Sequence, residues 1–276
     1  MKRPFVSILV FALVAVSAVS AVSTASAQTP SDDPASLKLA EPDFTLIGLP
    51  TSLRLPKFGS AFRVTHRFTT PLNGDFGDLA SDLFGLDSGA QIGLEYRFGI
   101  VPNGQIGIHR TSNKTIEFFG QYAAIRQSAG SPLNISGIVT IEGTNNFKDS
   151  YSPAVGAIVS RDIGDVAALY VEPIWVNNTS PLPKELVDHN STFIVGLGAR
   201  IRIRPTVYIS GEAAPRTGFK GASVTHGSFA IEKRVGGHLF QLNFSNAFGT
   251  TLAQIARGGP IENDWYLGFN ISRKFY

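Results

Sequence analysis

Two segments of the chain place a histidine two residues before a serine, a spacing that suits hydrolytic chemistry. They pair His189 with Ser191, and His226 with Ser228. Residues i and i+2 of a β-strand point to the same face, so the imidazole can take the proton of a serine hydroxyl that attacks an ester. Lipid hydrolases of bacterial outer membranes use such a pair. Five histidines among many serines give two matches by chance, however, and both segments border predicted loops. We predict that the chain is not an enzyme, and that His226 and Ser228 are the better pair if it is a hydrolase.

The sequence contains no spacing typical of a metal site. It has no cysteine, and its five histidines are scattered, so the paired ligands of a zinc site are absent. Four aspartates gather between residues 70 and 88, without the spacing of a calcium-binding loop; they are Asp75, Asp78, Asp82 and Asp87. We predict a solvated acidic loop there, with no metal and no cofactor.

Charged side chains alternate with apolar ones along several segments that read as strands. Residues 61–69 place Phe62, Val64 and Phe68 on one face and Arg63, Thr65 and Arg67 on the other. If the apolar faces meet lipid, the charged faces line the inside of a barrel. The predicted lumen-lining residues are Arg63, Arg67, Arg97, Arg200, Arg202, Arg234 and Lys274, together with Glu95, Glu117, Glu172, Glu212 and Glu232. These charges either pair and close the lumen or line a small water-filled pore, and the sequence leaves both alternatives open.

The elements that must position these residues are short strands of alternating character. Twelve are predicted, at 61–69, 90–98, 105–110, 115–126, 133–142, 154–161, 166–176, 193–203, 206–213, 227–234, 238–246 and 265–276. Asn103-Gly104 and Gly236-Gly237 fall where tight hairpin turns are needed, because both pairs tolerate positive φ.

The connections between these strands alternate in length. Long ones are predicted at 70–88, 143–152, 177–190, 214–225 and 247–263, with 111–114 as the exception, and short ones at 99–104, 128–132, 161–165, 204–205 and 234–237. A membrane barrel with both termini in the periplasm has long outer loops and tight inner turns. The pattern therefore predicts an all-β fold, a single antiparallel transmembrane β-barrel of about twelve strands spanning residues 59–276.

The N-terminus has the form of a secretion signal. Lys2 and Arg3 precede an apolar stretch, and Ala25 and Ala27 are small at the positions that signal peptidase reads, so residues 1–27 are predicted to be cleaved before Gln28. Residues 28–58 are then a periplasmic N-terminal arm or a plug, since Pro50 and Pro56 disfavour a strand.

Composition excludes several other classes. Removal of Lys2 and Arg3 leaves 22 basic and 21 acidic side chains, so the charge gives no reason to expect nucleic-acid binding. The rest of the chain has no apolar run long enough for a transmembrane helix, which excludes a multi-span helical membrane protein.

The chain ends in the manner of an outer-membrane barrel, which usually closes on an aromatic residue that the insertion machinery reads. Trp265, Leu267, Phe269 and Ile271 share one face, and the register ends at Phe275, followed by Tyr276. We expect these last two residues to form the insertion signal. Outer-membrane lipid and the barrel-insertion machinery are the expected partners, and the oligomeric state stays open.

Several motifs resemble those of an uncharacterised family of bacterial outer-membrane β-barrels, known only as a domain of unknown function. They are Thr65-His66-Arg67-Phe68, Leu83-Phe84-Gly85-Leu86-Asp87, Leu94-Glu95-Tyr96, Gly107-Ile108-His109-Arg110-Thr111-Ser112, Lys114-Thr115-Ile116-Glu117 and Arg126-Gln127. The resemblance covers most of residues 55–276 and is strongest in 60–130. It implies the barrel fold and the bacterial outer membrane, but no activity.

Taken with the charged inner faces, these features favour a passive channel or porin for small solutes. The alternatives are a closed structural or interaction barrel and, third, an outer-membrane lipid hydrolase.

Overall fold

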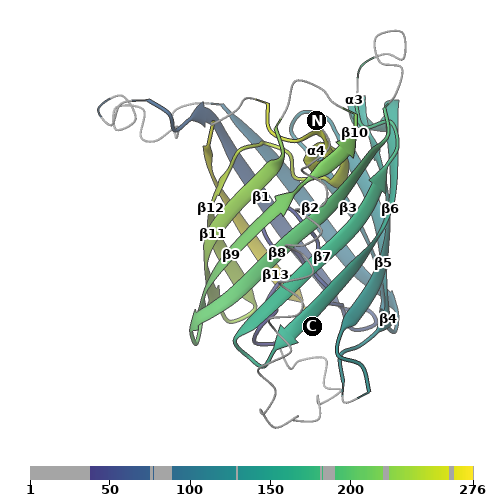
Figure 1. The fold of residues 1–276 in the computed structure, drawn as a ribbon, viewed down its shortest axis with the longest axis vertical. Coiled ribbons are helices and arrows are strands. Elements are labelled where there is room, and N and C mark those ends of the chain that lie inside the picture. Colours follow the sequence, from purple (N-terminus) through teal and green to yellow (C-terminus); the bar gives the residue numbers. More distant parts are fainter. Residues whose placement is uncertain are drawn as a thin grey trace, which may run out of the picture. The chain divides into compact units, whose positions relative to one another are not determined.

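The computed structural model describes residues 38–74, 77, 89–128, 130–180, 182, 190–219, 224–260 and 264–275. They form one antiparallel sheet that closes on itself as a barrel (Figure 1). Its strands are β1 (Ser60–Pro71), β2 (Ala90–Val101), β3 (Gly104–Thr111), β4 (Ile116–Ile125), β5 (Asn134–Gly143), β6 (Asp149–Ile163), β7 (Ala167–Val176), β8 (Thr192–Arg204), β9 (Val207–Ala214), β10 (Arg216–Gly218), β11 (His226–Val235), β12 (His238–Ser245) and β13 (Tyr266–Phe275). Two short helical turns accompany them, α3 (Thr144–Phe147) and α4 (Leu252–Arg257).

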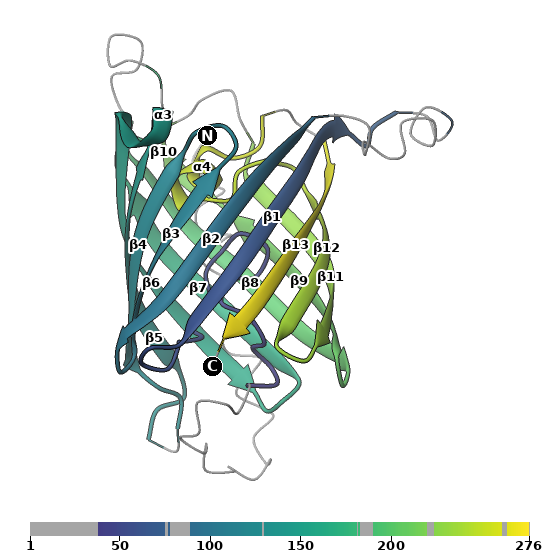
Figure 2. The ribbon, with the colours of Figure 1, turned by 180° about the vertical axis from the view of Figure 1, so that it is seen from behind.

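The barrel closes where its first strand meets its last. β1 pairs with β2 on one side and with β13 on the other, as Figure 2 shows. β9 and β10 are one wall strand interrupted at Pro215, and both pair with β8. The wall therefore has twelve strands, which confirms the predicted fold.

Alternation of side chains along the strands separates an apolar outer face from a polar inner one. On β2, Leu94 and Tyr96 are 49% and 44% exposed, whereas Glu95 and Arg97 between them are 3% and 5% exposed. The outward side chains of the other strands are likewise mostly aliphatic or aromatic. Because the polar side chains point inward, the wall has the polarity of a membrane barrel, opposite to that of a soluble one.

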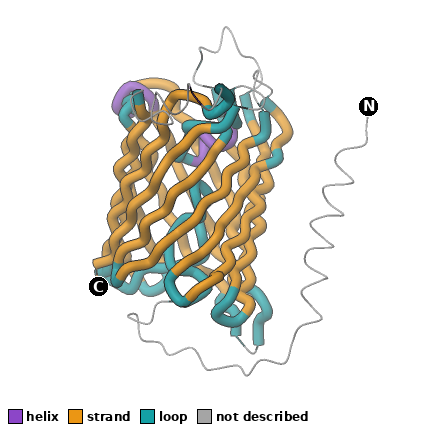
Figure 3. The backbone as a smooth tube through the Cα atoms, turned by 90° about the vertical axis from the view of Figure 1, so that its left-hand side faces the viewer, coloured by secondary structure: helices purple, strands orange, loops and turns teal. Residues whose placement is uncertain are grey.

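Most connections are sorted by length between the two ends of the barrel; the exceptions are 112–115 and 144–148, which are short, and 126–133, which is longer than the other turns at its end. The end that holds Ser60 and Phe275 carries the tight turns, including 164–166, 205–206 and 236–237 (Figure 2). We call it the short-turn end, and the opposite end, with the α3 and α4 connections, the long-loop end (Figure 3).

One predicted long connection was wrong in extent. It was expected at 143–152, but β6 begins at Asp149 and leaves only 144–148 between the strands. The pairing of Glu142 with Ser152 extends the hairpin past the apolar alternation that was used to place the strand. Among the described residues, no helix is long and apolar enough to cross a membrane.

Several predictions concern residues outside the described ranges. These are the signal segment 1–27, the lead-in 28–37, the four aspartates Asp75, Asp78, Asp82 and Asp87, His189 and the terminal Tyr276.

Candidate functional site

We call residues 38–58 the N-terminal plug, because all of this segment except its exposed ends lies inside the barrel. Every residue from Ala40 to Leu53 is buried. The chain reverses at Ile47 and Gly48, where Thr45 forms a bridge with Pro50 and the Leu46 N–H donates to the Leu49 carbonyl at 2.8 Å. The plug therefore presents a turn of backbone to the middle of the lumen.

The Glu212 carboxylate of β9 holds the tip of this turn. It accepts hydrogen bonds from the backbone N–H groups of Ile47, Gly48 and Leu49 at 2.9, 2.8 and 3.0 Å. A Cβ on Gly48 would lie 2.9 Å from Cδ1 of Ile255 and 3.2 Å from Oε1 of Glu212, so only glycine allows this approach without a shift of its neighbours. Three charge-assisted bonds to one carboxylate make Glu212 the principal anchor of the tip.

A second anchor joins the plug to β8, β11 and β12. The Arg200 guanidinium donates to the Thr45 carbonyl at 2.7 Å and pairs with Glu232, with 2.8 Å between Nε and Oε2. Gln241 donates both to the Leu46 carbonyl and to Glu232, at 2.7 Å in each case. The buried ion pair and the backbone of the plug thus share one hydrogen-bond network.

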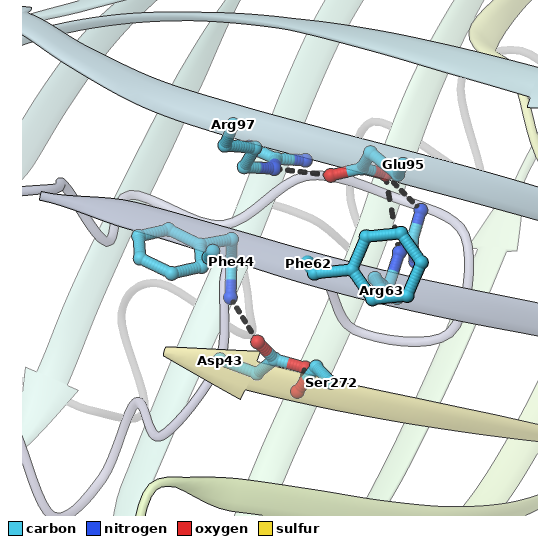
Figure 4. Close-up of a pocket in the computed structure, with 8 residues that line it drawn as sticks. Asp43, Phe44, Phe62, Arg63, Glu95, Arg97 and Ser272 are labelled. Atoms are coloured by element: carbon cyan, nitrogen blue, oxygen red, sulfur yellow. Dashed lines mark hydrogen bonds and ion pairs between the residues drawn. The ribbon is translucent and has the colours of Figure 1, made fainter. Parts of the chain in front are cut away.

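A third contact lies on β1 and β2, where Glu95 pairs with two arginines. Its partners are Arg63, at 2.5 Å, and Arg97. Arg63 also reaches the plug, where its Nη1 donates to Oγ1 of Thr45 at 2.7 Å. Figure 4 shows Arg63, Glu95 and Arg97 among the residues that line a small cavity. Its volume is about 10 Å³, roughly the least volume that holds one water molecule. The cavity is lined by Asp43, Phe44, Ala61, Phe62, Arg63, Glu95, Arg97 and Ser272. It is far too small for a solute path.

The base of the plug is fixed near the short-turn end. Glu41 is fully buried and accepts from the Tyr170 hydroxyl and from the Ser52 N–H, both at 2.9 Å, while Lys38 lies 3.6 Å away. Burial raises the pKa of the Glu41 carboxyl above its ordinary value near 4.5, although the Lys38 ammonium opposes the shift. The base is therefore the part of the plug whose binding should depend on pH.

The other end of the lumen is occupied by α4, which turns inward from the loop between β12 and β13 (Figure 1). The Leu252 N–H of α4 donates to Glu117 at 3.0 Å. Thr251 caps the helix, and its hydroxyl donates to Glu142. Arg257 pairs with Glu142 at 2.5 Å. Glu117 and Glu142 are cross-strand neighbours on β4 and β5. This acidic pair holds α4 against the wall.

The plug and α4 meet on an apolar part of the inner wall. Leu46 and Leu49 of the plug belong to one buried cluster with Leu252 and Ile255 of α4. The wall contributes Ile138, Ile158, Ile174 and Ile194, from β5 to β8. Two separate segments, one from each end, therefore fill the lumen.

The predicted lumen-lining residues lie on inward faces, with differences in depth. Nine are buried: Arg63, Arg67, Glu95, Arg97, Glu117, Glu172, Arg200, Glu212 and Glu232. Arg202, Arg234 and Lys274 are half-buried near the short-turn end, where Lys274 donates to the Pro42 carbonyl. The sequence did not say which of these charges pair; Arg200 pairs with Glu232, because the stagger of the barrel decides which wall residues face each other.

The sequence left open whether residues 28–58 form an arm or a plug, and the described part, residues 38–58, lies largely in the lumen. Sequence reasoning missed α4, which occupies the other end of the lumen. It also missed Glu142 as the partner of α4, although the alternation of β5 places Glu142 on the inner face. Among the described residues no group of three or more His, Asp or Glu side chains is arranged to hold a metal ion.

His226 and Ser228 lie together, with 3.4 Å between Nε2 and Oγ. Both are buried in the lumen, and each contacts the same oxygen of Glu212 at 3.0 Å. A nucleophilic triad needs the histidine between serine and carboxylate, using both ring nitrogens; here Nε2 makes the contact to Glu212, and Nδ1 has no partner among the described residues. The two side chains orient Glu212 toward the plug.

Comparison with known proteins agrees with this architecture. Residues 44–275 match the family described as a membrane bound beta barrel domain (DUF5777). The chain belongs to this family. The match includes most of the plug as well as the wall, so the two form one domain of the family. No curated protein matches the chain.

Several solved structures with a similar fold are porins or channels. An outer-membrane channel from Pseudomonas putida F1 aligns with a TM-score of 0.52 at 12% identity, over 81% of this chain and 98% of that one. The KdgM porin and the NanC porin each align with a TM-score of 0.50, at 6% and 7% identity, over 79% of this chain and 99% of theirs. At such identities the likeness shows a shared fold, that of outer-membrane barrels.

Proposed function

We propose that this protein is a passive outer-membrane channel for small hydrophilic solutes, closed in the described conformation by the N-terminal plug and α4. One observation carries the proposal: two separate segments fill the lumen, and the wall side chains alone do not. Barrels of about eight strands are filled by their own side chains, whereas wider ones enclose space. A lumen that admits a turn of polypeptide has room for a solute once that turn has moved.

The inner wall offers suitable chemistry for such a path. Displacement of the plug would free Arg63, Arg200, Glu212 and Gln241, all of which now bond its backbone or side chains. Charged and amide groups that line a pore replace part of the hydration shell of a polar solute. Water can replace the hydrogen bonds of the plug once it moves, and the packing of Leu46 and Leu49 is the apolar contact that release must break.

The proposed location in the outer membrane rests on both ends of the chain. Residues 1–27 are a signal peptide cleaved before Gln28, and Phe275 with Tyr276 forms the signal read by the barrel-insertion machinery. In the membrane the short-turn end, which holds Phe275 and the base of the plug, faces the periplasm. The long-loop end then faces the cell exterior, and outer-membrane lipid covers the apolar outer faces.

No enzymatic activity is proposed. The arrangement of His226 and Ser228 around Glu212 supports a role in positioning the plug. Hydrolysis of a lipid would require these side chains on the outer face, where a lipid ester can reach them.

Single-channel recording in planar bilayers tests the proposal. The mature protein is expected to open rarely, and a variant lacking residues 38–55 is expected to give steady conductance. Heat-modifiable gel mobility serves as the control that both proteins form closed barrels. A correctly folded deletion variant that stays silent even with R257A, which removes the ion pair of α4 with Glu142, would refute the channel and favour a closed structural or interaction barrel.

A further inference from the structure

The connection between β5 and β6 has an unusual backbone. Asn145 and Asn146 of α3 have φ/ψ of 50°/49° and 59°/44°, and Phe147 has φ of 64°. This is the left-handed region, which asparagine tolerates and a bulky side chain avoids. Three consecutive residues of this kind persist only if the contacts around them fix the turn.

The contacts of Phe147 explain what the turn achieves. Its ring lies edge-on to Phe118 at 5.1 Å and 88°, and also 5.1 Å from the ring of Tyr151, whose hydroxyl donates to the Phe147 carbonyl at 3.2 Å. Phe118 and Tyr151 are 42% and 45% exposed on the outside of the barrel. The left-handed turn thus adds a third ring to an aromatic cluster that faces the surroundings of the barrel.

Three cationic residues adjoin the same turn. Arg110 of β3 donates from Nη2 to Oδ1 of Asn146 at 3.0 Å, and the carbonyl of Lys114 accepts from the Asn146 N–H at 2.7 Å. Lys148 follows the turn directly, and all three side chains are exposed. Within the part of the chain that the structure describes, none of them forms an ion pair. The nearby Asp149 carboxylate is instead bound by the amide of Asn145 at 2.8 Å.

These residues form one surface at the long-loop end, which we call the rim patch. It comprises Arg110, Lys114, Phe118, Phe147, Lys148 and Tyr151. Arg110 points outward on a strand whose other outward side chains are Ile106 and Ile108, which are 46% and 38% exposed. A guanidinium beside an apolar belt is favourable only if it reaches a polar headgroup.

We propose that the rim patch binds the phosphorylated headgroup of an anionic lipid in the leaflet at the long-loop end. The cations bind the phosphate, Arg110 through its planar fork, and the three rings pack against the sugar or the upper part of the acyl chains, as aromatic residues do at membrane interfaces. We propose a lipid and not a free phosphate ion because only a lipid has a sugar and acyl chains that the rings can contact. This site lies outside the lumen and does not depend on conduction.

Lipid binding to the purified protein tests the proposal, with native mass spectrometry in detergent as the measurement. The probes are diphosphorylated lipid A, the same lipid without phosphates, and inorganic phosphate. The wild-type protein is expected to retain the phosphorylated lipid at least tenfold more tightly than the dephosphorylated one. The triple variant R110A/K114A/K148A is expected to lose that preference.

Two control variants separate the rim patch from general effects of charge and folding. K233A/R273A removes two exposed outward cations near the short-turn end and should leave binding unchanged. F147N keeps the left-handed turn and all three cations but removes the ring, and should weaken lipid retention without changing the affinity for inorganic phosphate. Equal binding of both lipids, equal loss in K233A/R273A, or inorganic phosphate bound as tightly as the lipid would overturn the proposal.

Discussion

Replacement of Glu212 by glutamine should release the tip of the plug. In the native site Oε2 accepts from the N–H groups of Ile47 and Leu49, and Oε1 accepts from that of Gly48. Glutamine turns one of these oxygens into an NH₂ donor, so at least one N–H of the plug then faces another donor. The remaining bonds lose the help of the negative charge.

The size of the effect follows from these contacts. A hydrogen bond to a charged group contributes about 1.5–3 kcal/mol, and a neutral one about 1 kcal/mol. Loss of one or two bonds and weakening of the rest destabilises docking by about 2–5 kcal/mol, which is a rise in the undocked fraction of about 30-fold to 5,000-fold.

Thiol labelling measures this fraction directly, because the chain has no cysteine of its own. Ser52→Cys places a thiol at a plug position that is 6% exposed, and the same substitution is present in every protein compared. The labelling rate reports the population of the undocked state when docking is fast relative to the reaction. E212Q should accelerate labelling by the factor given above and should raise channel open probability.

The matched control is E172Q. Glu172 is also a fully buried lumen glutamate, but neither carboxylate oxygen has a hydrogen-bond partner among the described residues. Its replacement should leave the labelling rate near that of the parent protein. If E212Q labels at the parental rate, or if E172Q accelerates labelling equally, Glu212 is not the anchor of the plug.

Two further predictions concern the ends of the lumen. R257A removes the ion pair between α4 and Glu142. In the barrel lacking residues 38–55, this substitution should increase single-channel conductance. An unchanged conductance would mean that α4 does not narrow the path. Because the pKa of Glu41 is higher in the docked plug than its ordinary value, the docked state binds a proton more tightly. Docking should therefore strengthen as the pH falls through the raised pKa and become constant below about 4.5. The measurement is slower labelling of Leu53→Cys, a plug position that is 8% exposed, after correction for the reagent's own pH dependence. E41Q should abolish this trend.

The wall of the barrel could be predicted from sequence because strand periodicity is local. Along β1 or β2, successive side chains must point to opposite faces, so Arg63, Glu95 and Arg97 could be assigned to the interior without knowledge of any other strand. The same rule placed Phe275 at the outward end of the last strand. Because lipid lies outside the barrel and polar contacts lie inside, the apolar face of each strand can be assigned to the outside.

The partners of those inward residues could not be predicted in the same way. Arg200 of β8 pairs with Glu232 of β11, and not with Glu95. The number of strands and their stagger decide which inward positions approach each other. The left-handed turn at Asn145 is another example, since its conformation depends on Phe118 and Tyr151 from neighbouring strands.

By itself the sequence determined that this chain folds as a membrane barrel of about twelve strands with charged residues inside, because alternation and turn chemistry are properties of short segments. Only the tertiary structure decided what fills the barrel. Residues 38–58 have no strand or helix pattern, and α4 is six residues long. Their position depends on a lumen wide enough to admit them and on Glu212, Glu117 and Glu142, which come together only when the sheet closes.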